Sequence, residues 1–194
     1  MSHQINAVIN NIDAHKQILN FPKGEKPSLA PNEWIILGGS KDEQGLLDLG
    51  HGSHKVMAPF IWWIQHHNEA AIQNKAKSGQ IGVWFAADDD ILKHAELIER
   101  GKKLWPLVGV HFPIFRDGRS FSTAALLRDR LQWTGEIRAI GDVLIDQLLQ
   151  GARVGFDSFA LRPDQNVDLA LKQFDLFSVT TQNSWRDKRA SLNI

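Results

Sequence analysis

Short apolar segments alternate with amphipathic segments through the second half of the chain, and this alternation limits the possible folds. The apolar segments are QIGVWF at 80–85, PLVGVHF at 106–112, EIRAIG at 136–141 and FDSFALR at 156–162. Each has the length of a strand, and helix-length segments follow each of them. This pattern is typical of β/α units, in which helices connect parallel strands. The sequence therefore predicts an α/β fold with a mainly parallel sheet of about five β/α units.

Two architectures satisfy this pattern. One is an open, doubly wound sheet, and the other is an incomplete barrel. A complete eight-unit barrel usually needs about 250 residues, and this chain has 194. The sequence does not choose between the two.

The two ends of the chain differ from the central part. We predict an N-terminal arm over residues 1–56 that holds a short strand at WIILGG, 34–39, and a Gly-rich loop. An α/β domain then covers 57–178, and it begins with one helix from Met57 to about Lys77. A polar tail, 179–194, completes the chain.

The composition excludes several classes of function. Lys and Arg number 22, and Asp and Glu also number 22, so no net charge draws the chain to nucleic acid or to an anionic membrane. There is no cysteine, which excludes disulfides, thiol catalysis and thiolate-bound metals. The N-terminus lacks an apolar signal core, and the run VMAPFIWWI is too short to span a bilayer. We therefore expect a cytoplasmic protein, and the histidine spacing predicts no metal site.

The stretch 111–142 carries the strongest concentration of charge, with five arginines and four acidic residues. In either architecture a ligand binds beyond the carboxyl ends of the strands. The turn at Asp117 is followed by Arg119, Ser120 and Ser122 at the start of a helix. An arginine and hydroxyl groups beside free backbone N–H groups predict a small-anion site. A capped helix with an Arg–Asp pair explains the same residues.

Arg138 lies in the middle of a predicted strand, and we include it in the anion site. A buried guanidinium needs a carboxylate or a bound anion, because an unpaired buried charge is very costly. The candidate carboxylates are Asp117, Asp142 and Asp157. An ion pair inside the protein is the alternative to an anion-binding role.

Three residues near the predicted strand ends are candidates for proton transfer. His111 enters the arginine-rich stretch, and Asp117 and Asp142 follow neighbouring strands. Each also has a structural interpretation, since Asp142 is well placed to cap a helix.

Three segments carry a resemblance to a known family. They are FPIFRDGRSFSTAALLRDR, GEIRAIGDVLIDQ and RVGFDSFALR, within residues 107–162, and IGVWFAADDD extends the similarity upstream. Over roughly residues 57–165 the chain resembles a bacterial family of uncharacterised proteins, a domain of unknown function. Members are encoded beside sulfite reductase and sulfate-assimilation genes, and they are labelled "probable oxidoreductase involved in sulfite reduction".

The resemblance implies a process rather than a reaction. It suggests an accessory factor in sulfite reduction or sulfate assimilation, which binds a small anion or an acidic cofactor such as sirohaem. Sulfite reductase, or another sulfur-assimilation protein, would be its partner. The absence of cysteine and of a dinucleotide fingerprint gives the chain no visible redox group of its own, and the sequence identifies no cofactor.

Two other interpretations compete with the accessory factor. In one, the protein is a small α/β enzyme acting on a phosphorylated or sulfated metabolite. Arg119 and Arg138 would then hold the anion, and His111, Asp117 or Asp142 would move protons. In the other, the arginines form ion pairs with the acidic residues of the same stretch and bind no ligand.

Overall fold

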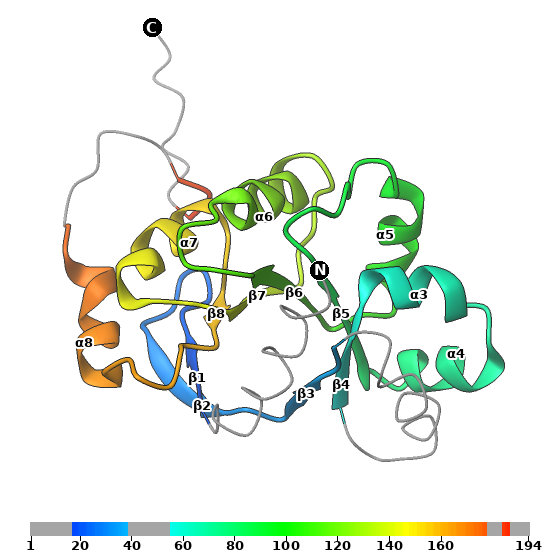
Figure 1. Ribbon diagram of the computed structural model, residues 1–194, viewed down its shortest axis with the longest axis horizontal. Coiled ribbons are helices and arrows are strands. Elements are labelled where there is room, and N and C mark those ends of the chain that lie inside the picture. The colour runs from blue at the N-terminus through cyan, green and yellow to red at the C-terminus, as the bar shows by residue number, and fades with distance from the viewer. Residues whose placement is uncertain (1–16, 39–54, 178–183, 187–194) are drawn as a thin grey trace, which may run out of the picture.

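The computed structural model describes residues 17–38, 55–177 and 184–186 of the chain. Part of the predicted arm (1–16 and 39–54), residue 178 of the predicted α/β domain and most of the predicted tail (179–183 and 187–194) lie outside these ranges. The described residues form one curled sheet with helices on its outer face (Figure 1).

The sheet has eight strands in the order β2-β1-β8-β7-β6-β5-β4-β3. Strands β3 to β8 lie in chain order and pair in parallel, whereas β1 pairs antiparallel with both β2 and β8. The α/β class is confirmed, but the mainly parallel sheet of about five units is wrong, because the sheet is mixed. The bounds are β1 Gln17–Asn20, β2 Ser28–Pro31, β3 Trp34–Ile36, β4 Lys55–Pro59, β5 Ile81–Phe85, β6 Leu107–Phe112, β7 Glu136–Gly141 and β8 Ser158–Phe159.

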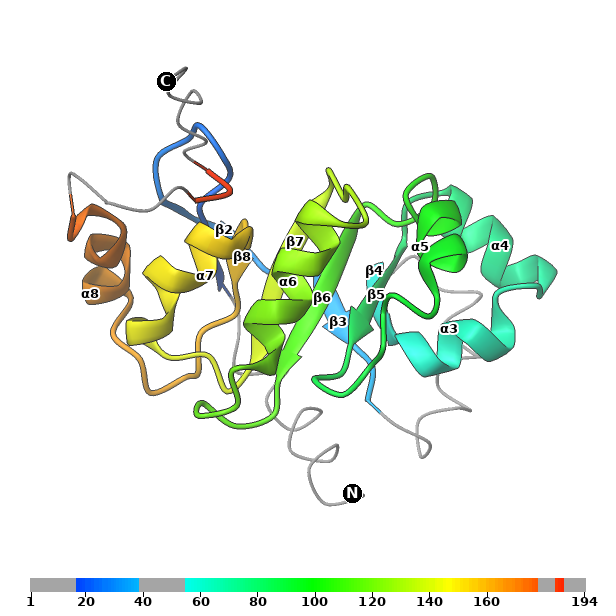
Figure 2. The same ribbon diagram turned by 90° about the horizontal axis from the view of Figure 1, so that it is seen from above.

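The helices cover the convex face of this sheet, as Figures 1 and 2 show. The α-helices are α3 Phe60–His66, α4 Ala70–Lys77, α5 Ala95–Gly101, α6 Arg119–Asp129, α7 Leu148–Val154 and α8 Val167–Lys172, with short 3-10 helices η2 Ile145–Gln147 and η3 Gln173–Asp175. Strands β5 to β8 lie within the four apolar segments predicted as strands, and the predicted strand at 34–39 is confirmed as β3.

The single helix predicted from Met57 to Lys77 is wrong. Its first residues form β4, and α3 begins only after Pro59. The residue before a proline is biased towards extended backbone, and Pro59 itself is extended with ψ 140°. The apolar run MAPFIWWI therefore supplies a buried strand and a buried helix in succession.

The two outermost strands of the sheet are almost consecutive in the chain. Strand β2 ends at Pro31 and β3 begins at Trp34, so only Asn32 and Glu33 connect the two opposite edges. A flat eight-stranded sheet cannot satisfy so short a connection, because neighbouring strands are about 4.8 Å apart. The sheet therefore curls into a half-barrel, which decides between the two architectures left open by the sequence.

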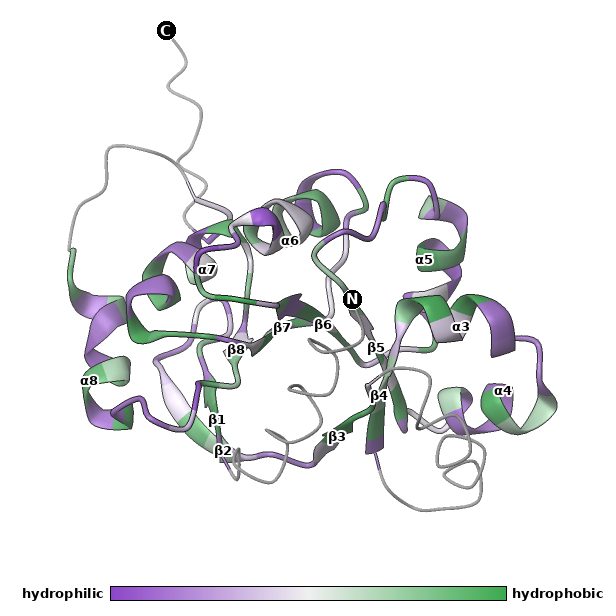
Figure 3. Cartoon of the chain, in the orientation of Figure 1, coloured by the Kyte–Doolittle hydropathy of each residue, from purple (hydrophilic) through white to green (hydrophobic). Residues whose placement is uncertain are grey.

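Apolar side chains fill both faces of the curled sheet. The larger core lies between the convex face and the helices, and a smaller one on the concave face includes Trp34, Met57 and Trp84. The smaller core can pack closely against β6 because residue 109 is a glycine: a Cβ atom there would lie only 2.9 Å from Trp84 Cβ. Figure 3 shows the same distribution, with hydrophobic strands at the centre and mixed colours on the helices.

Candidate functional site

The carboxyl ends of β4 to β8 lie along one edge of the half-barrel, which we call the mouth, and its loops are tied together. After β6, the Phe115 N–H donates to Asp142 Oδ2 at 2.8 Å, and Gln147 Nε2 donates to Phe115 O at 2.7 Å. Arg162, which follows β8, donates from Nη1 to Asp142 Oδ1 at 2.9 Å. Asp142, predicted as a proton-transfer group, thus joins the loops after β6, β7 and β8. Figure 2 shows these loops along its lower edge.

The loop between β6 and α6 presents Arg119 to solvent. The guanidinium forms a bidentate ion pair with Asp117, in which Nη2 lies 2.6 Å from Oδ2 and Nε lies 3.0 Å from Oδ1. Hydrogen bonds from Arg119 lower the pKa of Asp117. The Arg119 side chain is nevertheless 59% exposed. The predicted Arg–Asp pair is present, and it leaves Nη1 of Arg119 available.

The two serines of this predicted anion site differ in accessibility. Ser120 is fully buried, and its Oγ donates to His111 O at 2.6 Å. Ser122 is exposed on the first turn of α6. Ser120 therefore anchors the helix to β6, and Ser122 faces solvent on the same turn.

A third arginine in this region was not singled out from the sequence. Arg116 is exposed in the loop after β6 and has no hydrogen-bond or ion-pair partner within 17–38, 55–177 and 184–186. Its neighbours Ile114 and Phe115 are also exposed, by 37% and 48%. Arg116 and Arg119 lie on either side of Asp117 in the sequence, and nothing in the sequence indicated which of them would pair with it.

His111 lies on the concave side of β6, one residue before the strand ends. It is 8% exposed, and its ring makes an edge contact with Trp84 at a centroid distance of 5.5 Å. Burial lowers the pKa of His111 to about 4, so the imidazole is neutral at physiological pH. Neither ring nitrogen has a hydrogen-bond partner in the part of the chain that the structure describes. A neutral imidazole of this kind can accept a proton.

Arg138 also points into the concave side, but it lies further from the mouth. Its Nε and Nη2 donate to Glu136 Oε1 at 2.9 and 2.7 Å, Nε also donates to Ser158 Oγ, and Nη1 donates to Asn32 Oδ1 at 3.2 Å. The predicted partners Asp117, Asp142 and Asp157 are wrong. Glu136 is the partner because side chains two residues apart on a strand share a face. Arg138 thereby ties the β2–β3 connection to the middle of the sheet.

A comparison with protein-family models finds one match. The model described as "Bacterial protein of unknown function (DUF934)" matches residues 82–192. The chain belongs to this family. Comparisons with curated proteins and with solved structures found no match.

The DUF934 match confirms the resemblance to a bacterial family of unknown function. It runs from Gly82 in β5 past the last described residue. All the residues predicted for the anion and proton-transfer sites lie inside it, whereas β1 to β4 lie outside. The family description names no activity, so function has to be inferred from the site.

Sequence reasoning missed the most completely buried charge in this DUF934 protein. The Arg128 guanidinium uses all five N–H groups: it donates to Gly155 O twice, to Trp133 O, to Gly135 O and to Asp157. Burial lowers the pKa of Arg128 and raises that of Asp157. Arg130, two residues later, is exposed, and the sequence gave no sign of which of the two arginines is buried.

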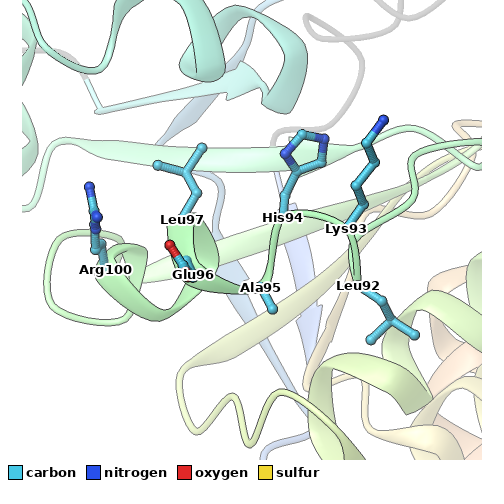
Figure 4. A pocket seen from close by; sticks show the side chains of 7 residues that line it. All are labelled: Leu92, Lys93, His94, Ala95, Glu96, Leu97 and Arg100. Carbon is cyan, nitrogen blue, oxygen red and sulfur yellow. The ribbon is translucent and has the colours of Figure 1, made fainter.

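A cavity of about 410 Å³ lies in the loop after β5 (Figure 4). Its lining comes from one segment alone, Leu92–Leu97 with Arg100, and Figure 4 shows Leu92 and His94 pointing to opposite sides of it. Because no second element contributes a group, we do not include this cavity in the site. In the same loop, burial raises the pKa of Asp89, which accepts from the Ala86 N–H at 2.7 Å.

The structure identifies no metal centre and no membrane span in its described ranges. No group of three or more His, Cys, Asp or Glu residues there is arranged to hold a metal ion. No helix within those ranges is long and apolar enough to cross a membrane. The candidate site at the mouth consists of Arg116 and Arg119 after β6, and His111 lies one residue before the end of the same strand, on its concave side.

Proposed function

We propose that this protein is an accessory factor in sulfite reduction or sulfate assimilation that binds a small anion at the loop after β6. The link to sulfur metabolism rests on the resemblance of the segments in 107–162 to proteins encoded beside sulfite reductase genes. The anion-binding half rests on the exposed guanidinium groups of Arg116 and Arg119.

The observation that carries the proposal is the unpaired Arg116, which directly precedes Asp117 and lies three residues before Arg119. Asp117 neutralises one of the two positive charges, so one net positive charge remains on the loop. Arg119 Nη1 and the Arg116 guanidinium supply N–H donors in a geometry suited to oxyanions. Ser122, exposed on the adjoining turn, adds a hydroxyl donor.

The same loop supports a protein partner. Ile114 and Phe115 expose apolar surface next to Arg116, and a mixture of aromatic and arginine side chains is typical of protein interfaces. Sulfite reductase, or another sulfur-assimilation protein, is the proposed partner. Phe115→Ser should weaken the binding of purified sulfite reductase, measured by biolayer interferometry, without lowering the melting temperature.

Thermal melts with sulfite, sulfate and phosphate at constant ionic strength test whether the loop after β6 binds an anion. At least one of these should raise the melting temperature of the wild type, and Arg116→Met or Arg119→Met should abolish the rise. Arg130→Met is the matched control, because Arg130 is an exposed arginine at the opposite end of α6. The anion site is excluded if no anion raises the melting temperature, or if Arg130→Met removes the effect equally.

A second candidate function is an enzyme acting on a phosphorylated or sulfated metabolite. It is favoured by His111, the one predicted proton-transfer residue that no ion pair occupies, since Asp117 and Asp142 are held by Arg119 and Arg162. Incubation with phosphate and sulfate monoesters should then release inorganic anion in the wild type and not in His111→Asn. An equal rate in both proteins would exclude this role for His111.

A further inference from the structure

A second cavity, of about 360 Å³, lies at the opposite end of the half-barrel from the mouth. It is formed where β1 ends, where β7 and β8 begin, and by Trp185 from the C-terminal part of the chain. Figure 2 shows the segment containing Trp185, in red, beside the blue turn between β1 and β2. Its polar and aromatic lining comes from Asn20, Lys23, Thr134, Glu136, Asp157 and Trp185.

Two carboxylates in this lining each have one oxygen without a hydrogen-bond partner. Asp157 accepts from Arg128 and from the Ile137 N–H through Oδ2 alone, and it is only 8% exposed. Glu136 accepts from Arg138 and Ser158 through Oε1 alone. Asp157 Oδ1 and Glu136 Oε2 accept no hydrogen bond from any residue that the structure describes. Neither oxygen is completely shielded from solvent, so both can accept a hydrogen bond from a ligand in the cavity.

The remaining lining adds hydrogen-bonding groups and one positive charge. The side-chain amide of Asn20 and the hydroxyl of Thr134 make no hydrogen bond with any described residue. Lys23 Nζ donates to Trp185 O at 3.2 Å, and lies 5.0 Å from the Trp185 ring centroid. Two of its three N–H donors remain for other acceptors. Lys23 and Thr134 are exposed, so the cavity opens to solvent on their side.

We propose that this cavity binds a small zwitterion of the α-amino acid type. The ammonium group would lie between Glu136 Oε2 and Asp157 Oδ1, and the carboxylate would contact Lys23. A volume of about 360 Å³ is near the lower end of the range for ligand pockets, which suits a small molecule. A simple amine fits less well, because Arg128 and Arg138 already balance the two carboxylates and Lys23 adds a further positive charge.

This site is distinct from the anion site at the mouth. In barrels of β/α units the chemistry takes place at the carboxyl ends of the strands, whereas the other end usually serves stability. The zwitterion would therefore act as an effector. It contacts Glu136, whose partner Arg138 holds the β2–β3 connection, so occupancy would stabilise the closure of the half-barrel.

The experiment follows the indole N–H signal of Trp185 by two-dimensional NMR of the full chain, with Trp185→Phe used to assign the signal. The probes are the common L-amino acids, each at millimolar concentration, with ethylamine and propionate as analogues that carry one charge. At least one amino acid should shift the signal saturably, and neither analogue should do so at equal concentration. Lys23→Met should bind that amino acid about two- to fivefold more weakly, as expected for loss of an exposed ion pair.

Matched variants keep the test decisive. Lys26→Met alters an exposed lysine of the same turn that does not line the cavity, and it should bind like the wild type. Asn20→Ala removes a lining amide without touching the Arg128 or Arg138 networks, and should also weaken binding. The proposal is overturned if no amino acid shifts the Trp185 signal, if propionate shifts it equally, or if Lys23→Met binds like wild type. None of these outcomes bears on the anion melts at the mouth.

Discussion

The arginine side chains between residues 111 and 142 fall into two groups according to their burial. Arg128 and Arg138 are buried, and carboxylates and backbone or side-chain oxygens surround their guanidinium groups. Arg116 and Arg119 are exposed, and Asp117 is the only carboxylate that binds either of them among the described residues. Burial therefore separates arginines that stabilise the fold from arginines that are available for a ligand.

Arg138→Met should destabilise the protein by about 3 kcal/mol. The change keeps the apolar stem but leaves Glu136 without its cation and releases Asn32. We expect the lower part of the range for broken buried pairs, because the Glu136 side chain is 32% exposed. Urea denaturation measures the free energy of unfolding.

A double variant and a surface control complete this test. Adding Glu136→Gln should recover part of the loss, because no carboxylate is then stranded. Arg130→Met should change the free energy of unfolding by no more than about 0.5 kcal/mol, as is usual for surface positions. A loss in Arg138→Met as small as this control would show that the buried pair does not stabilise the fold.

His111 should make stability depend on pH between about 6.5 and 4. In that range the unfolded chain binds a proton at this imidazole and the folded chain does not, so the free energy of unfolding falls as the pH falls. Above pH 6.5 both states are neutral and His111 contributes no slope. The shift corresponds to a loss on the order of 3 kcal/mol across the window. His111→Leu should show a correspondingly smaller loss when urea melts are compared at pH 7 and pH 4, and an equal loss would contradict the assignment.

Sequence reasoning found these residues more readily than their partners. Alternation along the strand placed Arg138 on an interior face and identified it as a buried charge that needs a carboxylate. The same alternation puts Glu136 on that face, so this partner was readable from the sequence but was not proposed. The contacts with Ser158 and Asn32 depend on the register of β7 with β8 and on the path of the β2–β3 connection, and neither is readable from one sequence. Arg128 was missed because its acceptors are mainly backbone carbonyl groups, which every residue carries.

At the scale of elements, the short segment Ser184–Arg186 contributes more than its length suggests. The Trp185 ring stacks on the Arg128 guanidinium, which lies 4.1 Å from the ring centroid. The backbone N–H of Trp185 donates to Arg153 O. Arg186 donates to Ala152 O at 2.9 Å and contacts the Phe21 ring. The segment thereby joins α7, the β1–β2 turn and α6 on one side of the sheet.

Trp185→Ala should reduce the free energy of unfolding by about 2 kcal/mol, since cation–π contacts with a desolvated cation reach this size. Trp185→Phe keeps a ring over Arg128 and should lose less than half of that. Chemical denaturation followed by far-UV circular dichroism gives both values. If the two variants lose equally, stacking on Arg128 is not the source of the stability.

The elements that could not be predicted share a physical cause. Strands β1 and β2 have four residues each, too few to show a periodic pattern, and β2 is largely exposed. They form strands because β1 pairs with β2 and with β8, and β8 is distant from β1 in the sequence. The long apolar run before Trp63 was assigned to one helix because periodicity does not separate a fully buried strand from a buried helix.

At the scale of the whole molecule, the half-barrel consists of the parallel strands β3 to β8 in chain order and a β1–β2 hairpin that extends the sheet beyond β8. Only β1 runs opposite to the other strands of the sheet. The β/α rhythm after residue 80 correctly indicated the α/β class and the central strands β6 and β7. The antiparallel pair β1 and β2, which makes the sheet mixed, comes from the part of the chain where the sequence carried least signal.

The two-residue connection through Asn32 and Glu33 has a consequence for synthesis on the ribosome. Chains emerge from their N-terminus, at about 5–20 residues per second in vivo. Strand β1 emerges some 140 residues before its partner β8. During that interval the nascent β1–β2 hairpin has an unpaired edge, which is a template for wrong pairing with other nascent chains. We therefore expect the yield of folded protein to depend more on translation speed and chaperone supply than on the stability of the folded state.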